Sequence, residues 1–179
     1  MFTFDTATDL SANFDIDVIS GDSGTEWHAG YGPASGFPGS DGGFVHFNTF
    51  ISSNSLAFKG GPVFLQSFEI SPQYDSGGSG VSQAIDADLD YHLRLYDISL
   101  TPILDTILTV GSTGAWETVT LNQAGVHAIW IARRDLDGTG TGGWWPNLDN
   151  ITTGNPVPEP STFAMGVVSL LGFFFVWRR

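Results

Sequence analysis

Apolar and polar residues alternate along much of residues 1–154, and this alternation predicts β-strands rather than helices. At 14–18 it predicts that Phe14, Ile16 and Val18 face a core, while the intervening aspartates face solvent. Residues 126–132 are apolar on both faces apart from His127, which predicts a central, buried strand. We expect about nine short strands, at 2–4, 14–18, 44–51, 63–70, 91–98, 103–110, 116–121, 126–132 and 148–152.

Turn signals separate these strands. Residues 9–12 are expected to form a turn, and the glycine-rich segments 21–40 and 135–143 are expected to form long loops. No helical period is found before residue 155. Many short strands with such turns predict an all-β fold, a jelly-roll-like β-sandwich. The strands near Phe2 and Leu148 are expected to pair side by side.

The tail, residues 155–179, follows a different pattern. Prolines at 156, 158 and 160 exclude an ordinary helix or a central strand from the linker 155–162. Residues 163–177 carry no charge and predict a membrane helix, although it is shorter than the roughly 20 residues that a full span needs. Arg178 and Arg179 form a basic end expected to stay on the cytoplasmic side. We therefore divide the chain into a body, 1–154, and this tail.

The tail contains a short motif made of Val157, Pro158, Glu159 and Pro160. Together with the apolar run and the terminal arginines, it resembles the PEP-CTERM sorting signal of bacterial surface proteins. The resemblance implies that an intramembrane exosortase cuts at or near Pro-Glu-Pro. The protein would be held briefly in the inner membrane and then passed to the cell surface or extracellular matrix. The alternative is a buried C-terminal helix after a proline-rich linker, and whether the tail is cleaved or retained stays open.

A sorted protein of this kind should enter the secretion pathway through an N-terminal signal with a basic start and an apolar run. Residues 1–5 have neither feature and instead read as a strand. We therefore expect that the true start lies upstream of Met1, or that the sequence begins at a mature or truncated point.

The charge of the chain argues against some classes of binding partner. A net charge of −13 argues against nucleic acid, which needs basic patches to neutralise phosphates. The 19 acidic residues are mostly aspartate, a turn residue and a hard oxygen ligand for calcium. Without cysteine, no disulfide braces the fold.

Two groups of aspartates are candidate sites for a structural calcium ion. Asp135 and Asp137 stand two residues apart on a glycine-rich segment. Asp149, in the closing strand, could instead reach Asp5 or Asp9 near the opening strand. The alternative for each of these aspartates is a solvated turn.

Aromatic residues are candidates for a platform that stacks on sugar rings: Trp27, Tyr31, Trp144 and Trp145. Adjacent residues on a strand point to opposite faces, so at most one of Trp144 and Trp145 is readily buried. Trp116 and Trp130 are instead expected to pack in the core.

Signatures of catalysis are weak. The G-x-S-x-G, H-E-x-x-H and P-loop motifs are absent, and the four histidines are scattered singly. The string at 21–24 resembles the nucleophile motif of chymotrypsin-like proteases, but no histidine precedes it. Glu69 and Glu117 could pair as glycosidase carboxylates, although nothing in the sequence brings them together.

The strings at 116–119 and 148–151 are similar to strands of jelly-roll, galactose-binding-like modules. That resemblance implies binding of sugars or surfaces, sometimes with a structural calcium. Our hypothesis is a non-enzymatic, exported surface or matrix protein that binds exopolysaccharide. The alternative is an extracellular glycan-processing enzyme.

Overall fold

The computed structural model describes residues 1–22, 25–28, 43–47, 53–74, 89–111, 116–133 and 144–154. This part of the chain forms one short helix and ten strands. In chain order they are α1 (Ala7–Asn13), β1 (Phe14–Ile16), β2 (Thr25–His28), β3 (Phe44–Phe47), β4 (Asn54–Phe58), β5 (Val63–Tyr74), β6 (Leu89–Tyr96), β7 (Pro102–Val110), β8 (Glu117–Val126), β9 (Ala128–Arg133) and β10 (Trp144–Gly154).

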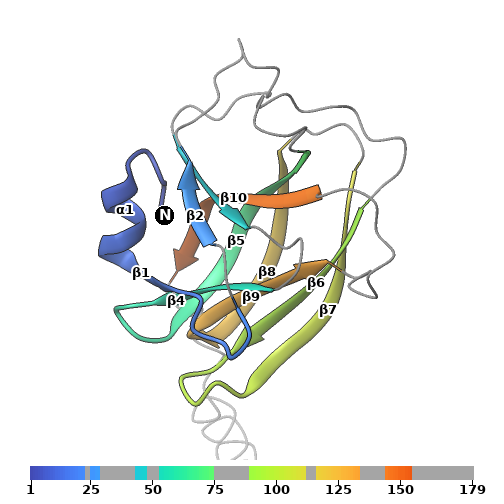
Figure 1. Ribbon diagram of the computed structural model, residues 1–179. Helices are drawn as coiled ribbons and strands as arrows, with labels where there is room; N and C mark the ends of the chain where they lie inside the picture. The colour runs from blue at the N-terminus through green and yellow to red at the C-terminus, as the bar shows by residue number, and fades with distance from the viewer. Residues whose placement is uncertain are drawn as a thin grey trace, which may run out of the picture.

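The strands form two five-stranded antiparallel sheets (Figure 1). The first sheet has the order β1-β4-β9-β6-β7, and the second has the order β2-β3-β10-β5-β8. One core cluster lies between them and draws on both sheets, with Ile129 and Ile131 from β9 and Phe68 and Ile70 from β5. Burying one apolar face of each sheet against the other is the physical reason for the sandwich. The predicted all-β, jelly-roll-like β-sandwich is confirmed.

The strand β9 lies in the middle of the first sheet, between β4 and β6. Ile129 and Ile131 face the core, and Ala128 and Ala132 are also buried. This placement confirms the prediction from the apolar run at 126–132. Strand β6 alternates as expected, because Tyr91, Leu93 and Leu95 are all buried in the core.

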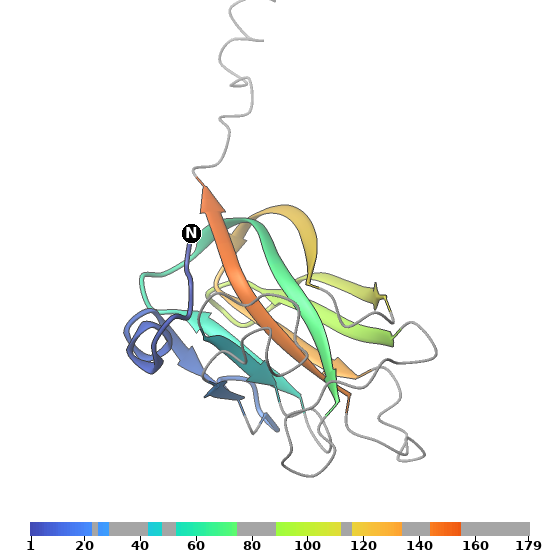
Figure 2. The same ribbon diagram turned by 90° about the horizontal axis from the view of Figure 1, so that it is seen from above.

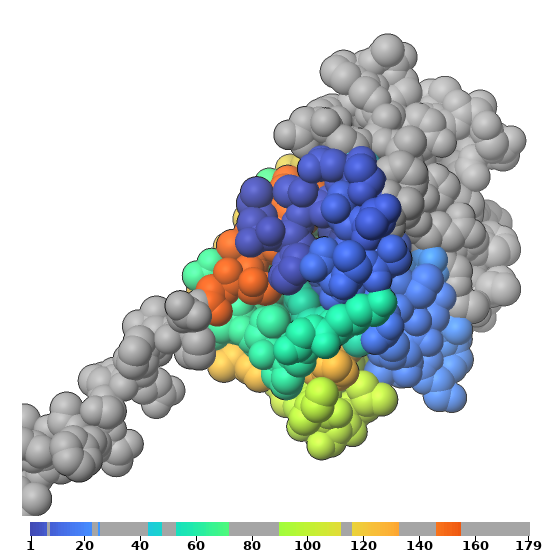
Figure 3. All heavy atoms as spheres, turned by 90° about the vertical axis from the view of Figure 1, so that its left-hand side faces the viewer, coloured from blue at the N-terminus to red at the C-terminus, as the bar shows by residue number. Residues whose placement is uncertain are grey.

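The first residues of the body, 1–154, meet its last strand, β10, in the second sheet. The backbone N–H of Phe2 donates to the carbonyl of Ile151 at 2.7 Å, and the two residues form an antiparallel bridge. The ring of Phe2 also packs edge-on against Phe14, with centroids 5.2 Å apart. Figures 2 and 3 show the N-terminal segment beside the end of β10. The opening and closing segments thus lie side by side as predicted, but residues 2–4 form a single bridge at Phe2 rather than the predicted strand.

Several local predictions are wrong. Residues 9–12 belong to the helix α1, not to a turn, because the Asp9 carboxylate accepts the backbone N–H of Thr6 at 2.7 Å and caps the first turn. The segment 21–40 contains β2, and β4 was not predicted as a strand. Ile16 is 43% exposed rather than in the core, since β1 is a three-residue edge strand that ends there.

The described strand ends give the sandwich two different ends. The end that we call the turn end carries the turns at 59–62 and 97–101, the connection from β8 to β9 at His127, and Gly154 at the end of β10. Its parts are joined by the pairs Val63 with Val126 and Phe64 with Gly154, and by the bond from the His127 N–H to the Tyr96 carbonyl at 2.7 Å.

The opposite end, the loop end, is where β5, β7 and β9 finish and β6, β8 and β10 begin. Three strand pairs define it, Tyr74 with Trp144, Leu89 with Val110 and Tyr91 with Arg133. The Gly111 N–H also donates to the Glu117 carboxylate at 2.7 Å, which joins the end of β7 to the start of β8. Residues 75–88, 112–115 and 134–143 therefore all connect strand ends at the loop end.

Burial predicts which isoleucine side chains contribute most to the stability of the sandwich. Ile131 is fully buried in the core, so Ile131→Ala should lower the free energy of unfolding by about 2 to 5 kcal/mol through lost contacts and a cavity. Ile107 lies on the outer face of β7 and is 37% exposed, so Ile107→Ala should cost only about 0.5 kcal/mol. Urea denaturation of both variants measures the difference, and equal losses would contradict the assigned core.

Candidate functional site

A row of polar residues crosses the second sheet on the face turned away from the core. His46 of β3 pairs in register with Asn147 of β10, which pairs in turn with Ser71 of β5. Their neighbours along the strands, such as Leu148 and Ile70, belong to the core, so alternation places the polar three on the other face. All three are nonetheless buried, and Asn147 is completely so.

The contact between His46 and Asn147 fixes the centre of this row. His46 Nδ1 lies 2.8 Å from the Asn147 amide oxygen. An amide oxygen only accepts, so Nδ1 is the donor and the imidazole is held in one orientation. The row therefore consists of hydrogen-bonding groups in fixed positions on a rigid sheet.

The row continues towards the turn end through a second set of polar groups. Asp149 of β10 lies opposite Glu69 of β5 in the register. Asn150 follows with a left-handed backbone, φ 49°, and its side-chain amide donates to the Glu69 carboxylate at 2.9 Å. Its backbone N–H donates to the Asp149 carboxylate at 2.7 Å. We call the six residues of the row the polar strip: His46, Glu69, Ser71, Asn147, Asp149 and Asn150.

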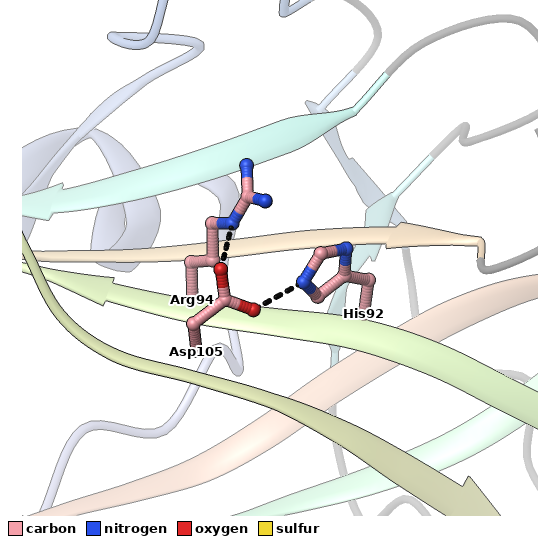
Figure 4. A network of polar contacts seen from close by, with 3 residues as sticks. All are labelled: His92, Arg94 and Asp105. Atoms are coloured by element: carbon pink, nitrogen blue, oxygen red, sulfur yellow. Dashed lines mark hydrogen bonds and ion pairs between the residues drawn. The ribbon is translucent and has the colours of Figure 1, made fainter.

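The first sheet has a polar network of its own on its outer face (Figure 4). The Asp105 carboxylate of β7 accepts hydrogen bonds from His92 and Arg94, both on β6, with Arg94 Nε at 2.8 Å. The Arg94 guanidinium lies over the Trp130 ring, 4.9 Å from its centroid, and His92 meets the same ring edge-on at 5.4 Å.

Trp130 also has a hydrogen-bond partner outside this network. Its ring N–H donates to Asp22 at 3.1 Å, and the hydroxyl of Ser55 donates to the same carboxylate. Asp22 belongs to the segment between β1 and β2, so the tryptophan ties that segment to the sheet. The indole is therefore packed and hydrogen-bonded, which confirms the prediction that Trp130 is a packing residue.

Electrostatics favour the ionised form of Asp105. The hydrogen bond from His92 is the largest cause that holds the pKa of Asp105 below its usual range, and the hydrogen bond from Arg94 is the second. The same carboxylate raises the pKa of Arg94. This network is paired within itself and links β6 to β7 above the Trp130 ring.

Three of the aspartates proposed as calcium ligands lie in the described part of the chain, and calcium binding by them stays a prediction. Asp9 caps α1, and Asp5 is exposed and accepts a hydrogen bond from the Thr3 hydroxyl at 3.0 Å. Asp149 lies in the polar strip. Within the described ranges, no three His, Asp or Glu side chains come together as a metal site. Asp135 and Asp137 lie outside the described residues, so calcium at that position stays a prediction.

The aromatic candidates are placed only by their backbone. Trp27 lies in β2, paired with Val45, rather than in the loop that the sequence suggested. Trp144 and Trp145 begin β10, paired with Tyr74 and Gln73. The positions of these three tryptophan side chains, and all of Tyr31, lie outside the described residues.

Trp116 is half-buried. Its ring packs against that of Phe44 on β3, with centroids 6.1 Å apart. Trp116 therefore packs against the buried ring of Phe44, but it lies outside the core in which it was expected.

The tail residues Val157, Pro158, Glu159, Pro160, Arg178 and Arg179 also lie outside the described residues. In the described ranges, no helix has the length and apolar character needed to cross a membrane. The membrane helix expected at 163–177 therefore stays a prediction.

The polar strip was not found from the sequence. A histidine between Val45 and Phe47 in an apolar run is a signal that could have indicated it, because a strand buried on both faces rarely carries an unpartnered histidine. Its partners Asn147 and Ser71 come from distant parts of the chain, and only the sheet register brings them together.

Comparison with known proteins identifies the tail. Residues 156–179 match the family model for the PEP-CTERM protein-sorting motif. This match confirms the resemblance drawn from the Pro-Glu-Pro string, and it marks the chain as a protein for export and sorting to the cell surface. A search of curated proteins found no sequence that matches.

Comparison with solved structures concerns the body. The arabinose-bound α-L-arabinofuranosidase MgGH51 aligns with a TM-score of 0.50 at 12% identity, over 83% of this chain and 24% of that one. TmCBM61 in complex with β-1,4-galactotriose aligns at 0.46 and 12% identity, over 79% and 88%. The family 32 CBM of C. perfringens NanJ with galactose aligns at 0.40 and 16% identity, over 71% and 93%. At 12% identity, the arabinofuranosidase match supports the fold alone.

The fold and the tail together define the class: a jelly-roll-like β-sandwich that carries a C-terminal surface-sorting signal.

The lowered pKa of Asp105 predicts a pH dependence. An unfolded aspartate has a pKa of about 3.9, so this group adds stability above that pH and loses it as the pH falls through its lower folded pKa. Asp105→Asn should therefore be slightly less stable than the native chain at neutral pH, and the difference should shrink in acid. Urea unfolding across a pH series measures it. A difference that stayed constant into strong acid would show that the carboxylate gains nothing from His92 and Arg94.

Proposed function

We propose that this chain is a non-enzymatic, exported surface or matrix protein whose body binds a glycan, with exopolysaccharide as the candidate ligand. The observation that supports this most is that the two ends of the sandwich differ. Gly154, which leads into the sorting tail, lies at the turn end, whereas Trp144 and Trp145 begin β10 at the loop end, directly after the segment that contains Asp135 and Asp137. A protein held by its tail thus presents the loop end outwards.

Glycan binding is supported by the chemistry of the second sheet. Sugar hydroxyls need rigid donors and acceptors, and the two half-buried members of the polar strip, Glu69 and Asn150, carry a carboxylate and an amide. The buried His46 and Asn147 fix the sheet beside them in one register. Trp145 stands two residues before Asn147 on β10, close along the chain to these groups. Aromatic rings suit the C–H faces of sugars, which is the role that we propose for Trp144 or Trp145, with Trp27 and Tyr31 as further candidates.

The route to the surface follows from the tail. We propose that residues 163–177 enter the inner membrane, that Arg178 and Arg179 keep the C-terminus on the cytoplasmic side, and that an exosortase cuts at or near Pro158-Glu159-Pro160. Each terminal arginine costs roughly 2.5 to 3.5 kcal/mol to place at the bilayer centre, so the pair stalls the tail in the membrane.

The alternative function is an extracellular glycan-processing enzyme that uses Glu69 and Glu117. The structure puts them on the neighbouring strands β5 and β8. Glu69 accepts the side-chain amide of Asn150, and Glu117 accepts the N–H of Gly111. Both carboxylates thus have a hydrogen-bonding role in the fold, which is why we favour the binding protein.

The sorting motif predicts a processed C-terminus. With an export signal supplied, a host with an exosortase should convert the chain to a surface form that lacks the residues beyond Pro158-Glu159-Pro160. Glu159→Ala, or deletion of Arg178 and Arg179, should leave the chain unprocessed or mislocalised, because recognition or the membrane stall is lost. Mass spectrometry of the C-terminus from surface and membrane fractions measures this.

Asn155→Ala is the matched control for that experiment, because residue 155 lies just outside the matched motif. The control should be processed like the native chain. A mature surface protein that still ends in Trp177-Arg178-Arg179 would mean that the tail is a permanent anchor.

The aromatic residues of β10 predict the binding site. On a glycan array, the chain should bind a polysaccharide, and either Trp144→Ala or Trp145→Ala should abolish that binding while the melting temperature stays nearly unchanged. Trp130→Ala is the contrasting variant, since it removes a packed ring and should lower the melting temperature. If Trp144→Ala and Trp145→Ala both destabilise the fold strongly, the platform is disproved.

The same assay separates the remaining proposals. Repeating it with millimolar calcium or a chelator tests the structural calcium ion, whose binding should also raise the melting temperature. Asp137→Asn should remove that rise if the site is at Asp135 and Asp137, and Asp5→Asn should remove it if the site is at Asp149.

The enzyme alternative predicts that the chain releases shorter sugars from a bound polysaccharide. Release by the native chain that is lost in Glu69→Gln would favour the enzyme.

A further inference from the structure

The turn between β6 and β7, residues 97–101, has an unusually complete set of hydrogen bonds. The Asp97 carboxylate accepts the backbone N–H groups of Ser99 and Thr101, both at 2.9 Å. The Asp97 N–H donates to the Thr101 carbonyl, and the Leu100 N–H donates to the Asp97 carbonyl, both at 3.0 Å. The aspartate thus holds this turn in one conformation.

This fixed turn exposes two large apolar side chains. Ile98 is 59% exposed and Leu100 is 43% exposed. Leu100 also has a left-handed backbone, φ 57°, which glycine or asparagine adopts at a lower cost than leucine. Neither side chain contributes to the core, so the fold itself does not explain why both positions are apolar.

The turn lies at the same end of the sandwich as the exit to the tail. Tyr96, just before the turn, is bonded to His127, and β8 beside it runs next to the start of β5, which pairs with Gly154. From Gly154 to the predicted membrane segment at residue 163, an extended chain reaches at most about 30 Å. A membrane-held tail therefore keeps the turn end close to the bilayer.

Charge at the turn end permits that approach. The turns at 59–62 and 97–101 contain one cation, Lys59, and one anion, Asp97, whereas the whole chain has a net charge of −13. Lys59 lies 3.5 Å from a second carboxylate, that of Asp15, so these three groups together carry one negative charge. The turns can therefore approach an anionic membrane surface with much less repulsion than the rest of the chain would meet.

We propose that Ile98 and Leu100 dock onto the lipid surface while the tail is held in the membrane. The tail and the turn then make two contacts with the bilayer, which orient the sandwich with its loop end outwards and hold Pro158-Glu159-Pro160 at the membrane surface for cutting. The proposal rests on the membrane-bound stage of the proposed function.

A fluorescent label at the turn tests it, because the chain has no cysteine and a single one can be introduced. Ser99→Cys carries an environment-sensitive nitrobenzoxadiazole dye between the two apolar residues, and Thr118→Cys carries it at an exposed position on β8 towards the loop end. The full chain is placed in vesicles of phosphatidylethanolamine and phosphatidylglycerol. The label at 99 should shift to the blue and be quenched by doxyl-labelled lipid, and the label at 118 should not.

Two variants identify the groups responsible. Ile98→Ser together with Leu100→Asn should abolish the shift of the label at 99 without disturbing the turn, because asparagine accepts the left-handed backbone. Ile107→Ser, the same chemical change on the outer face of β7, should leave the shift intact.

Flotation of the vesicles distinguishes a failure of the membrane-bound stage from a failure of the docking alone. A chain that fails to float with the vesicles would overturn the membrane stage and the docking with it. A chain that floats but shows no shift at residue 99, or the same shift at 99 and 118, would overturn the docking alone. A shift that survives in the double variant would assign the contact to other groups and would likewise overturn it.

Discussion

The burial of one apolar layer between two sheets is the constraint on which the rest of this structure depends. Each strand can give only alternate side chains to that layer, so the other side chains must be placed on the outer faces. The middle strands β9 and β10 anchor their sheets, and both carry core residues, such as Ile131 and Leu148. The positions of the polar strip and of the Asp105 network follow directly, because both lie on residues that the core cannot take.

The two outer faces treat their polar groups differently. On the first sheet, Arg94, His92 and Asp105 form a partly exposed network above a packed tryptophan, and this network mainly holds strands and a connecting segment together. On the second sheet, His46, Ser71 and Asn147 are buried although they face away from the core. Buried polar groups with fixed partners are costly to misplace, which makes this face specific in geometry. We therefore propose the second sheet, rather than the first, for ligand binding.

The two ends of the sandwich also differ from each other. Short turns that contain left-handed residues, such as Gly61 and Leu100, close the end at which β10 leads into the sorting tail. The longer connecting segments join strands at the opposite end. In the function that we propose, the turn end faces the membrane and the sorting enzyme, and the loop end faces the ligand.

The sequence by itself determined the sorting motif and the fold class. Pro158-Glu159-Pro160 and the terminal arginines act through local chain properties, so they can be recognised without a fold. The alternation in β6 and the continuous apolar run in β9 likewise indicate directly which side chains are buried. The same local signals did not predict α1 and β4. The seven-residue helix α1 depends on the cap formed by Asp9, and the short strand β4 depends on its pairing with neighbouring strands such as β9. Only the tertiary structure decided the polar strip, the Asp105 network and the two ends of the sandwich. His46 and Asn147 are 101 residues apart, and a pairing register, which depends on packing of the whole core, is what brings them within 2.8 Å.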